Sequence, residues 1–126
     1  MNLSLARQHY SMAKETQVDS TSQNAFAIKL AMEQLIEAME CLTSAESVES
    51  KELYFETALT RIYLLQKCLD FEKGGDLARN LFRIYEHARQ STIKITHKKI
   101  SNAEFQKTIE FIKVIHEGWD EMLRKD

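Results

Sequence analysis

Histidine and glutamate are the side chains in this sequence that could bind a metal inside a helical protein. Di-iron sites in four-helix bundles use a Glu-x-x-His spacing, which places a carboxylate and an imidazole on one helix face. The four histidines are His9, His87, His97 and His116, and none has a glutamate three residues before it. A single histidine such as His116, among apolar residues at helical spacing, is more typical of a hydrogen-bonded core or boundary residue. The sequence therefore predicts no metal site.

Groups that could bind phosphate or act as nucleophiles are also sparse. Gly74 and Gly75 lie in the segment EKGGD, which lacks the spacing of a phosphate-binding loop. Cys41 and Cys68 have no motif spacing, and in a reducing compartment such cysteines behave as small apolar residues. We expect neither a cofactor nor enzyme activity.

The composition favours a single helical domain over residues 1–126. The chain has 44% hydrophobic and 29% charged residues, which is typical of a globular protein, and it has three glycines and no proline. Its net charge is −2 without a basic stripe, so nothing predicts nucleic-acid binding. No apolar run is long enough for membrane insertion, and the N-terminus lacks the pattern of a signal peptide. We expect a cytoplasmic protein.

The sequence predicts an N-terminal arm at residues 1–19, followed by four segments with helical periodicity. Apolar residues recur at helical spacing within residues 24–42, 50–73, 76–95 and 101–124. Short polar connections make sequential helices antiparallel. The fold prediction is all-α, an antiparallel up-down four-helix bundle with an N-terminal arm.

A charged segment with two glycines separates the second and third predicted helices: Glu72, Lys73, Gly74, Gly75 and Asp76. Gly74 is expected to take the left-handed conformation that ends the second helix. Asp76 is expected to cap the third helix, where a carboxylate also suits the positive end of the helix dipole. These five residues predict a tight helical corner. Later in the chain, Ser101 and Glu104 have the spacing of a capping box.

The segment LDFEKGGDLARNLFRIYEHA around this corner resembles the FliS family of flagellin-specific export chaperones. The family pattern is L-D-x-E-K-G-G-E/D-I/L-A-x-N-L-x-x-L/I-Y-D/E-Y/H, between the second and third helices. Ala6 and Tyr10 resemble the A-x-x-x-Y of the family's N-terminal arm, and Trp119 resembles its late tryptophan. The family usually opens its first helix with S-P-x-x-L-I-x-x-L-Y/F-D-G. This chain departs from that pattern: Asn24 lies near the place of the proline, and polar and aliphatic residues replace the aromatic-Asp-Gly around Glu33.

The resemblance implies binding rather than catalysis. Its client would be the disordered C-terminal segment of flagellin, which such a chaperone keeps from polymerising and delivers to the flagellar export gate. A co-chaperone or regulator is a further possible partner, and the chain would be a monomer or weak homodimer. The alternative is a non-catalytic helical adaptor or regulatory protein.

The client would bind in shallow grooves, because the second and fourth predicted helices carry more apolar residues than one face can bury. In the arm, the resemblance implies that two apolar residues cover a client groove. The candidate client-binding or groove-covering residues are Leu5, Tyr10, Leu64, Phe71, Phe82, Tyr85 and Ile115.

Overall fold

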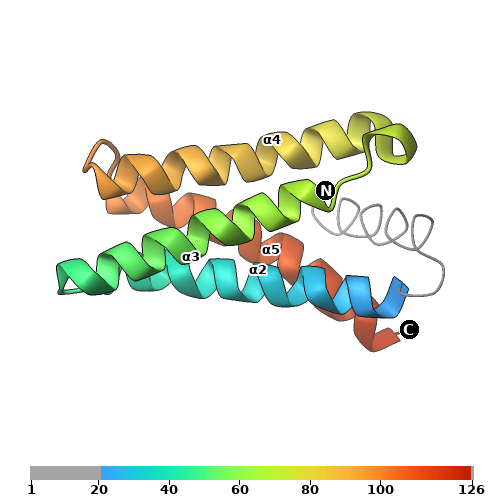
Figure 1. Ribbon diagram of the computed structural model, residues 1–126, viewed down its shortest axis with the longest axis horizontal. Coiled ribbons are helices and arrows are strands. Elements are labelled where there is room, and N and C mark those ends of the chain that lie inside the picture. Colours follow the sequence, from blue (N-terminus) through green and yellow to red (C-terminus); the bar gives the residue numbers. More distant parts are fainter. Residues whose placement is uncertain (1–20, 126) are drawn as a thin grey trace.

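The computed structural model describes residues 21–125, and these form an all-α bundle. The helices are α2 (Thr21–Ser44), α3 (Val48–Lys67), α4 (Phe71–Thr96) and α5 (Asn102–Lys125). Consecutive helices run antiparallel, so each contacts the helix before it and the helix after it (Figure 1). α2 and α5 also pack together and close the bundle. The predicted antiparallel four-helix bundle is confirmed, while the arm at residues 1–19, with Leu5 and Tyr10, lies outside the described residues.

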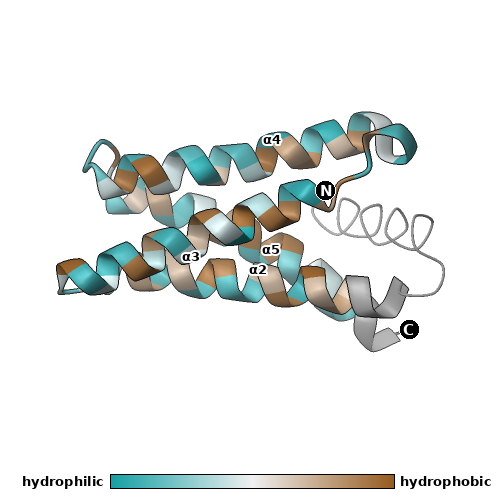
Figure 2. Cartoon of the chain, in the orientation of Figure 1, coloured by the Kyte–Doolittle hydropathy of each residue, from teal (hydrophilic) through white to brown (hydrophobic). Residues whose placement is uncertain are grey.

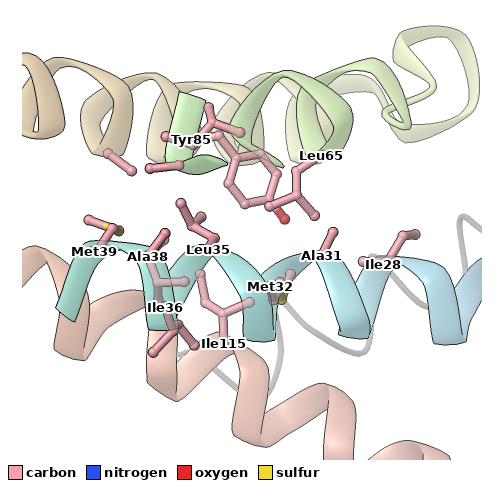
Figure 3. Packing of buried hydrophobic residues seen from close by; sticks show 14 of the residues in the cluster. Ile28, Ala31, Met32, Leu35, Ile36, Ala38, Met39, Leu65, Tyr85 and Ile115 are labelled. Atoms are coloured by element: carbon pink, nitrogen blue, oxygen red, sulfur yellow. The ribbon is translucent and has the colours of Figure 1, made fainter. Parts of the chain in front are cut away.

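The core is assembled from one apolar stripe on each of the four helices. Its largest fully buried side chains are Trp119, Tyr85, Phe105, Met32, Leu35, Met39, Ile62, Leu65, Leu81, Ile109, Ile112 and Ile115. Figure 3 shows Tyr85 of α4 and Ile115 of α5 among the inward side chains of α2. Removing such large side chains from water is the main contribution to the stability of a bundle of this kind.

The second helix ends earlier than the periodicity predicted. α3 stops at Lys67, with Cys68 as its C-cap, instead of continuing to residue 73. The Asp70 carboxylate accepts hydrogen bonds from the backbone N–H groups of Glu72 (3.0 Å) and Lys73 (2.9 Å). An aspartate that satisfies two free backbone donors starts a new helix, and Asp70 is therefore the N-cap of α4. Between the two helices, Leu69 is buried and holds the connection against the core.

The two glycines lie inside the first turns of α4, and the roles predicted for Gly74 and Asp76 were wrong. Gly74 continues the first turn, and its N–H donates to the Asp70 carbonyl oxygen at 2.8 Å. Gly75 instead breaks the helix, with φ 50° and ψ −125°. This backbone geometry belongs to the first central residue of a type II′ turn, which favours glycine strongly. Asp76 forms an ion pair with Arg79 three residues later, while the helix is capped by Asp70.

The opposite end of α4 uses a non-glycine residue where glycine is common. Lys98 has φ 57°, and its N–H donates to the Ile95 carbonyl oxygen at 3.1 Å. The Lys99 N–H donates to the Lys94 carbonyl oxygen at 2.8 Å. These two bonds form a Schellman motif, which satisfies carbonyls that the helix end leaves free. After this turn the Ser101 hydroxyl accepts from the Glu104 N–H at 3.1 Å, as predicted for a capping serine.

Candidate functional site

An exposed aromatic pair lies at the corner between α3 and α4. The rings of Phe71 and Phe82 are 5.9 Å apart between centroids and inclined at 59°. Both side chains are exposed, at 45% and 38% of their accessible area. Eleven residues of straight α-helix would separate their backbones by about 16 Å. The break at Gly75 turns the first turn of α4 back on the helix, and this brings the two rings together. The corner region is the curled start of α4 in Figure 1.

A polar cluster holds α3 and α4 together beside this pair. Gln66 of α3 donates through Nε2 to the Phe82 carbonyl oxygen (3.4 Å) and to Glu86 Oε1 (3.3 Å). Glu86 also accepts from Arg89 Nε at 2.9 Å and from Gln90 Nε2 at 3.2 Å. These bonds, chiefly the one from Arg89, lower the pKa of Glu86 to about 2. The cluster fixes the distance between the two helices next to the exposed rings.

Hydrophobic side chains also remain exposed on the outer faces of α2 and α3. Arg61 Nε of α3 donates to Gln34 Oε1 of α2 at 2.5 Å, which sets the register of this antiparallel pair. One turn further along lie Leu30 on α2 and Leu64 on α3, and both are exposed. On the other side of the Gln34–Arg61 contact, a shallow groove of about 200 Å³ reaches Leu53, which is also exposed. Brown segments mark hydrophobic residues along α3 and at its junction with α4 in Figure 2.

A larger groove runs between α4 and α5 and has a volume of about 460 Å³. Ile84, Phe111 and Ile112 supply its apolar surface, and Thr108 lies beside them. The Thr108 hydroxyl is 3.4 Å from the Ser91 hydroxyl and 3.5 Å from His87 Nε2. Small polar side chains at this level of the interface leave room that a large apolar side chain would fill. The exposed rim is formed by Arg83, His87, Glu104 and Lys107.

The fourth seam of the bundle, between α2 and α5, is bridged by charged groups. The pairs are Lys29–Asp120 (3.0 Å), Glu33–His116 (2.8 Å) and Glu40–Lys113 (2.7 Å). The hydrogen bond to Asp120 is the main cause of the raised pKa of Lys29. His116 is thus the hydrogen-bonded boundary residue that the sequence predicted. Glu33 lies where this chain departs from the FliS pattern, and its carboxylate contacts α5.

The structure divides the predicted client-binding residues into exposed and buried groups. Leu64, Phe71 and Phe82 are exposed and remain candidates for client contact. Tyr85 and Ile115 are fully buried, so predicting them as surface contacts was wrong. Burial is also the main cause of the raised pKa of the Tyr85 hydroxyl.

The prediction fails for Tyr85 and Ile115 because several apolar residues adjoin the main stripe of each helix, and the packing decides which of them face inward. It also missed Phe26, Leu30, Leu53 and the groove between α4 and α5. Leu30 and Leu53 could have been found from the sequence, because each is a leucine on the polar side of its helix, opposite the apolar stripe.

Residues 21–125 include no group of three or more His, Cys, Asp or Glu side chains placed to hold a metal ion. Among the helices of this described region, none is both long and apolar enough to cross a membrane. What the fold does present is uncovered hydrophobic surface on α2, α3 and α4 and an apolar groove beside α5. These features define the class as a helical bundle with surfaces suited to binding other proteins.

Comparison with known protein families shows to which family this helical bundle belongs. The sequence model described as "Flagellar protein FliS" matches residues 6–126, so the chain belongs to the FliS family. A relative, the flagellar secretion chaperone FliS of Vibrio cholerae serotype O1, is 34% identical over 65 residues. That alignment covers 52% of this chain and 47% of the relative, so the matched part spans about half of each protein. The comparison with solved structures gives no match.

Proposed function

We propose that this protein is a cytoplasmic flagellar export chaperone whose client is the C-terminal segment of flagellin. It would keep that segment from polymerising and deliver flagellin to the export apparatus. Membership of the FliS family and the name of the Vibrio cholerae relative support the general role. Flagellin, an export-gate component and a co-chaperone or regulator are the proposed partners. The chain would act as a monomer or weak homodimer, without turnover of a substrate.

The observation that carries this proposal is the exposed apolar surface at the corner of α3 and α4. Phe71 and Phe82 expose hydrophobic area at the end of the bundle where the two helices meet. An amphipathic segment that is disordered alone can fold onto such a surface and bury its apolar face. Its loss of chain entropy offsets part of the contact energy, which suits a client that must later be released.

The N-terminal arm completes the proposal. Leu5 and Tyr10 would cover a client groove in the free protein and be displaced or repacked when flagellin binds. These two residues lie outside the described part of the chain, and their role rests on the resemblance of Ala6 and Tyr10 to the family's arm.

Binding of purified flagellin tests the proposal. Calorimetry with full-length flagellin should show roughly equimolar binding and a large negative change in heat capacity, because apolar surface is buried. Flagellin without its C-terminal helices should not bind. Undiminished binding of the truncated flagellin would refute the proposed client segment. A helical adaptor or regulatory protein, the alternative function, would bind neither form.

Substitutions at the exposed aromatic pair test whether flagellin binds at the corner of α3 and α4. Replacing both Phe71 and Phe82 by serine should weaken flagellin binding about tenfold or more, because buried aromatic side chains dominate most interfaces. Val48→Ser is the control, since Val48 is exposed at the other end of α3. An unchanged dissociation constant in the double variant, with the bundle still folded, would place the client elsewhere.

A further inference from the structure

The groove between α4 and α5 has positively charged side chains on both of its edges. Arg83 stands on the α4 edge and Lys107 on the α5 edge, and both are exposed. Within residues 21–125 neither of them takes part in an ion pair. Lys29, Lys113 and Arg89, in contrast, are each paired with a carboxylate. The groove therefore has two cations available to a partner in a chain whose net charge is −2.

Glu104 is the carboxylate on this rim, and together with Arg83 and Lys107 it leaves the rim with a net positive charge of one. Glu104 lies in the first turn of α5, and its N–H is bonded to the capping Ser101 hydroxyl. The positive end of the helix dipole stabilises a carboxylate at such a position. In the described part of the chain, Arg83 donates to the neutral side-chain oxygen of Asn80 at 3.2 Å and to no carboxylate. Arg83 and Lys107 are therefore the rim charges best placed to attract an anionic group.

The shape of the groove favours a helix as its occupant. From Glu104 to Ile112 it follows α5 for about 12 Å at the α-helical rise. Its apolar surface comes from Ile84 on one helix and Phe111 and Ile112 on the other, so it lies along the centre of the groove with the charges at the edges. An amphipathic helix has the complementary arrangement, with an apolar stripe between polar flanks. Such a helix would place its flanks beside Arg83 and Lys107.

From this arrangement we infer that the α4–α5 groove is a docking site for a short amphipathic helix whose apolar stripe is flanked by carboxylates. It is separate from the aromatic corner, which faces α3 rather than α5. The inference goes beyond the proposed function, because it specifies the chemistry of a bound helix and does not require that helix to come from flagellin. Opposite charge at the edges selects the partner, while burial of the apolar stripe supplies most of the affinity.

Two synthetic helices provide the test. Both are stapled peptides of about three turns with the same leucine stripe; one carries glutamates on its flanks and the other carries lysines. Fluorescence anisotropy with the full chain should show the glutamate peptide binding roughly threefold to tenfold more tightly at low salt, from two exposed charge pairs. High salt should reduce the difference, because it screens exposed charges. Amide and methyl NMR shifts should change at Ile84, Phe111 and Ile112.

Reversing the rim charges tests whether the preference for the glutamate peptide comes from Arg83 and Lys107 or from the net charge of the whole protein. Arg83→Glu/Lys107→Glu should reverse the preference between the two peptides. Lys51→Glu/Lys67→Glu, which changes net charge equally on exposed positions of α3, should leave it unchanged. Arg83→Gln/Lys107→Gln should abolish the preference without adding like-charge repulsion, and circular dichroism would check that each variant is folded.

Some results would overturn the inference while leaving the flagellin proposal standing. These are no binding of either peptide, equal binding of both, a preference for lysine flanks, or shifts confined to the Phe71–Phe82 corner. Conversely, if the glutamate peptide binds more tightly and shifts the signals of Ile84 and Phe111, the groove inference is supported even if flagellin itself does not bind.

Discussion

Several residues between Asp70 and Tyr85 have roles within the fold itself. Ala78, Leu81 and Tyr85 are fully buried, and Asp70 caps α4. Gly75 supplies a backbone conformation that other residues rarely adopt. Phe71 and Phe82, by contrast, are exposed. The buried and capping residues therefore build the corner, and Phe71 and Phe82 add an exposed aromatic surface to it.

Glu86 gives a prediction at this scale. Its carboxylate is bonded to Arg89, Gln90 and Gln66, and its pKa is about 2. Because this value lies below the ordinary 4.5 of the unfolded chain, the stabilisation is complete above about pH 4.5 and is lost as the pH falls towards 2. Glu86→Gln should lower the free energy of unfolding by about 0.5–1 kcal/mol at neutral pH, the range of a partly exposed ion pair.

Urea unfolding at a series of pH values measures this effect. The difference between Glu86→Gln and the unaltered protein should shrink steadily from pH 4.5 to pH 2. Glu117→Gln is the control, because Glu117 is an exposed carboxylate on α5. A loss of stability that stays constant down to pH 2 would show that the glutamine disturbs packing and that the charge is not responsible.

At the scale of elements, the break at Gly75 determines how α4 begins. A Cβ at this position would meet no atom within 4 Å, so a substitution there acts through the backbone conformation alone. Gly75→Ala should lower the free energy of unfolding by about 1–3 kcal/mol. Gly74→Ala is the matched control, since Gly74 is in the helical turn and alanine there should be neutral or stabilising by about 0.5–1 kcal/mol. Equal effects of the two substitutions in chemical denaturation would contradict the different roles of these glycines.

The end of α4 gives the opposite prediction. Lys98 holds a left-handed conformation that costs a non-glycine residue about 1–2 kcal/mol. Lys98→Gly should therefore raise the free energy of unfolding by about 1 kcal/mol, with a higher melting temperature. Lys99→Gly should give no gain, because Lys99 is outside the positive-φ region. A lower melting temperature for Lys98→Gly would mean that its side chain contributes more than its strained backbone costs.

The sequence was sufficient to predict four helices, because each carries an apolar stripe at helical spacing. It was not sufficient to place the corner. Apolar residues continue at helical spacing past Lys67 to Phe71, and only Asp70, a good N-cap residue, marked the real boundary. Which apolar residues stay exposed depends on how four helices share their faces. Phe82 is exposed while Tyr85, one turn away, is buried, and periodicity within one helix could not distinguish them.

At the scale of the whole molecule, the four seams of the bundle have different surfaces. Ion pairs join α2 directly to α5. At the other three seams hydrophobic groups are exposed, next to polar contacts such as Gln34–Arg61 and Gln66–Glu86. A bound apolar segment at the α2–α5 seam would have to separate charged groups from their partners, at a cost in free energy. Among residues 21–125, no ion pair joins α3 to α4 at the Phe71–Phe82 corner or α4 to α5 across the groove, so binding there separates no interhelical ion pair. We therefore expect proteins that bind this chain to contact the sides that include α3 or α4.

The N-terminal arm is expected to cover part of these surfaces in the free protein. Leu5 and Tyr10 are apolar residues in a segment without a sustained helical stripe, so burying them requires a site on the bundle. A covered groove binds its client with an affinity reduced by the fraction of time that it is open. Deleting residues 1–10 should leave the bundle folded, because the four helices that the structure describes begin at Thr21 or later. The deletion should change the affinity or the association rate for flagellin, with tighter binding where the arm competes with the client.

Thermal unfolding and binding kinetics, measured on the same deletion, distinguish a cover from a part of the core. A cover contributes little to the stability of the bundle, so the melting temperature should change little while the association rate rises. Leu5→Ser/Tyr10→Ser should reproduce the effect of the deletion, because these two side chains, rather than the length of the arm, would cover the groove. A sharp fall in melting temperature, with unchanged affinity of the folded fraction, would instead make the arm a fixed extension of the core.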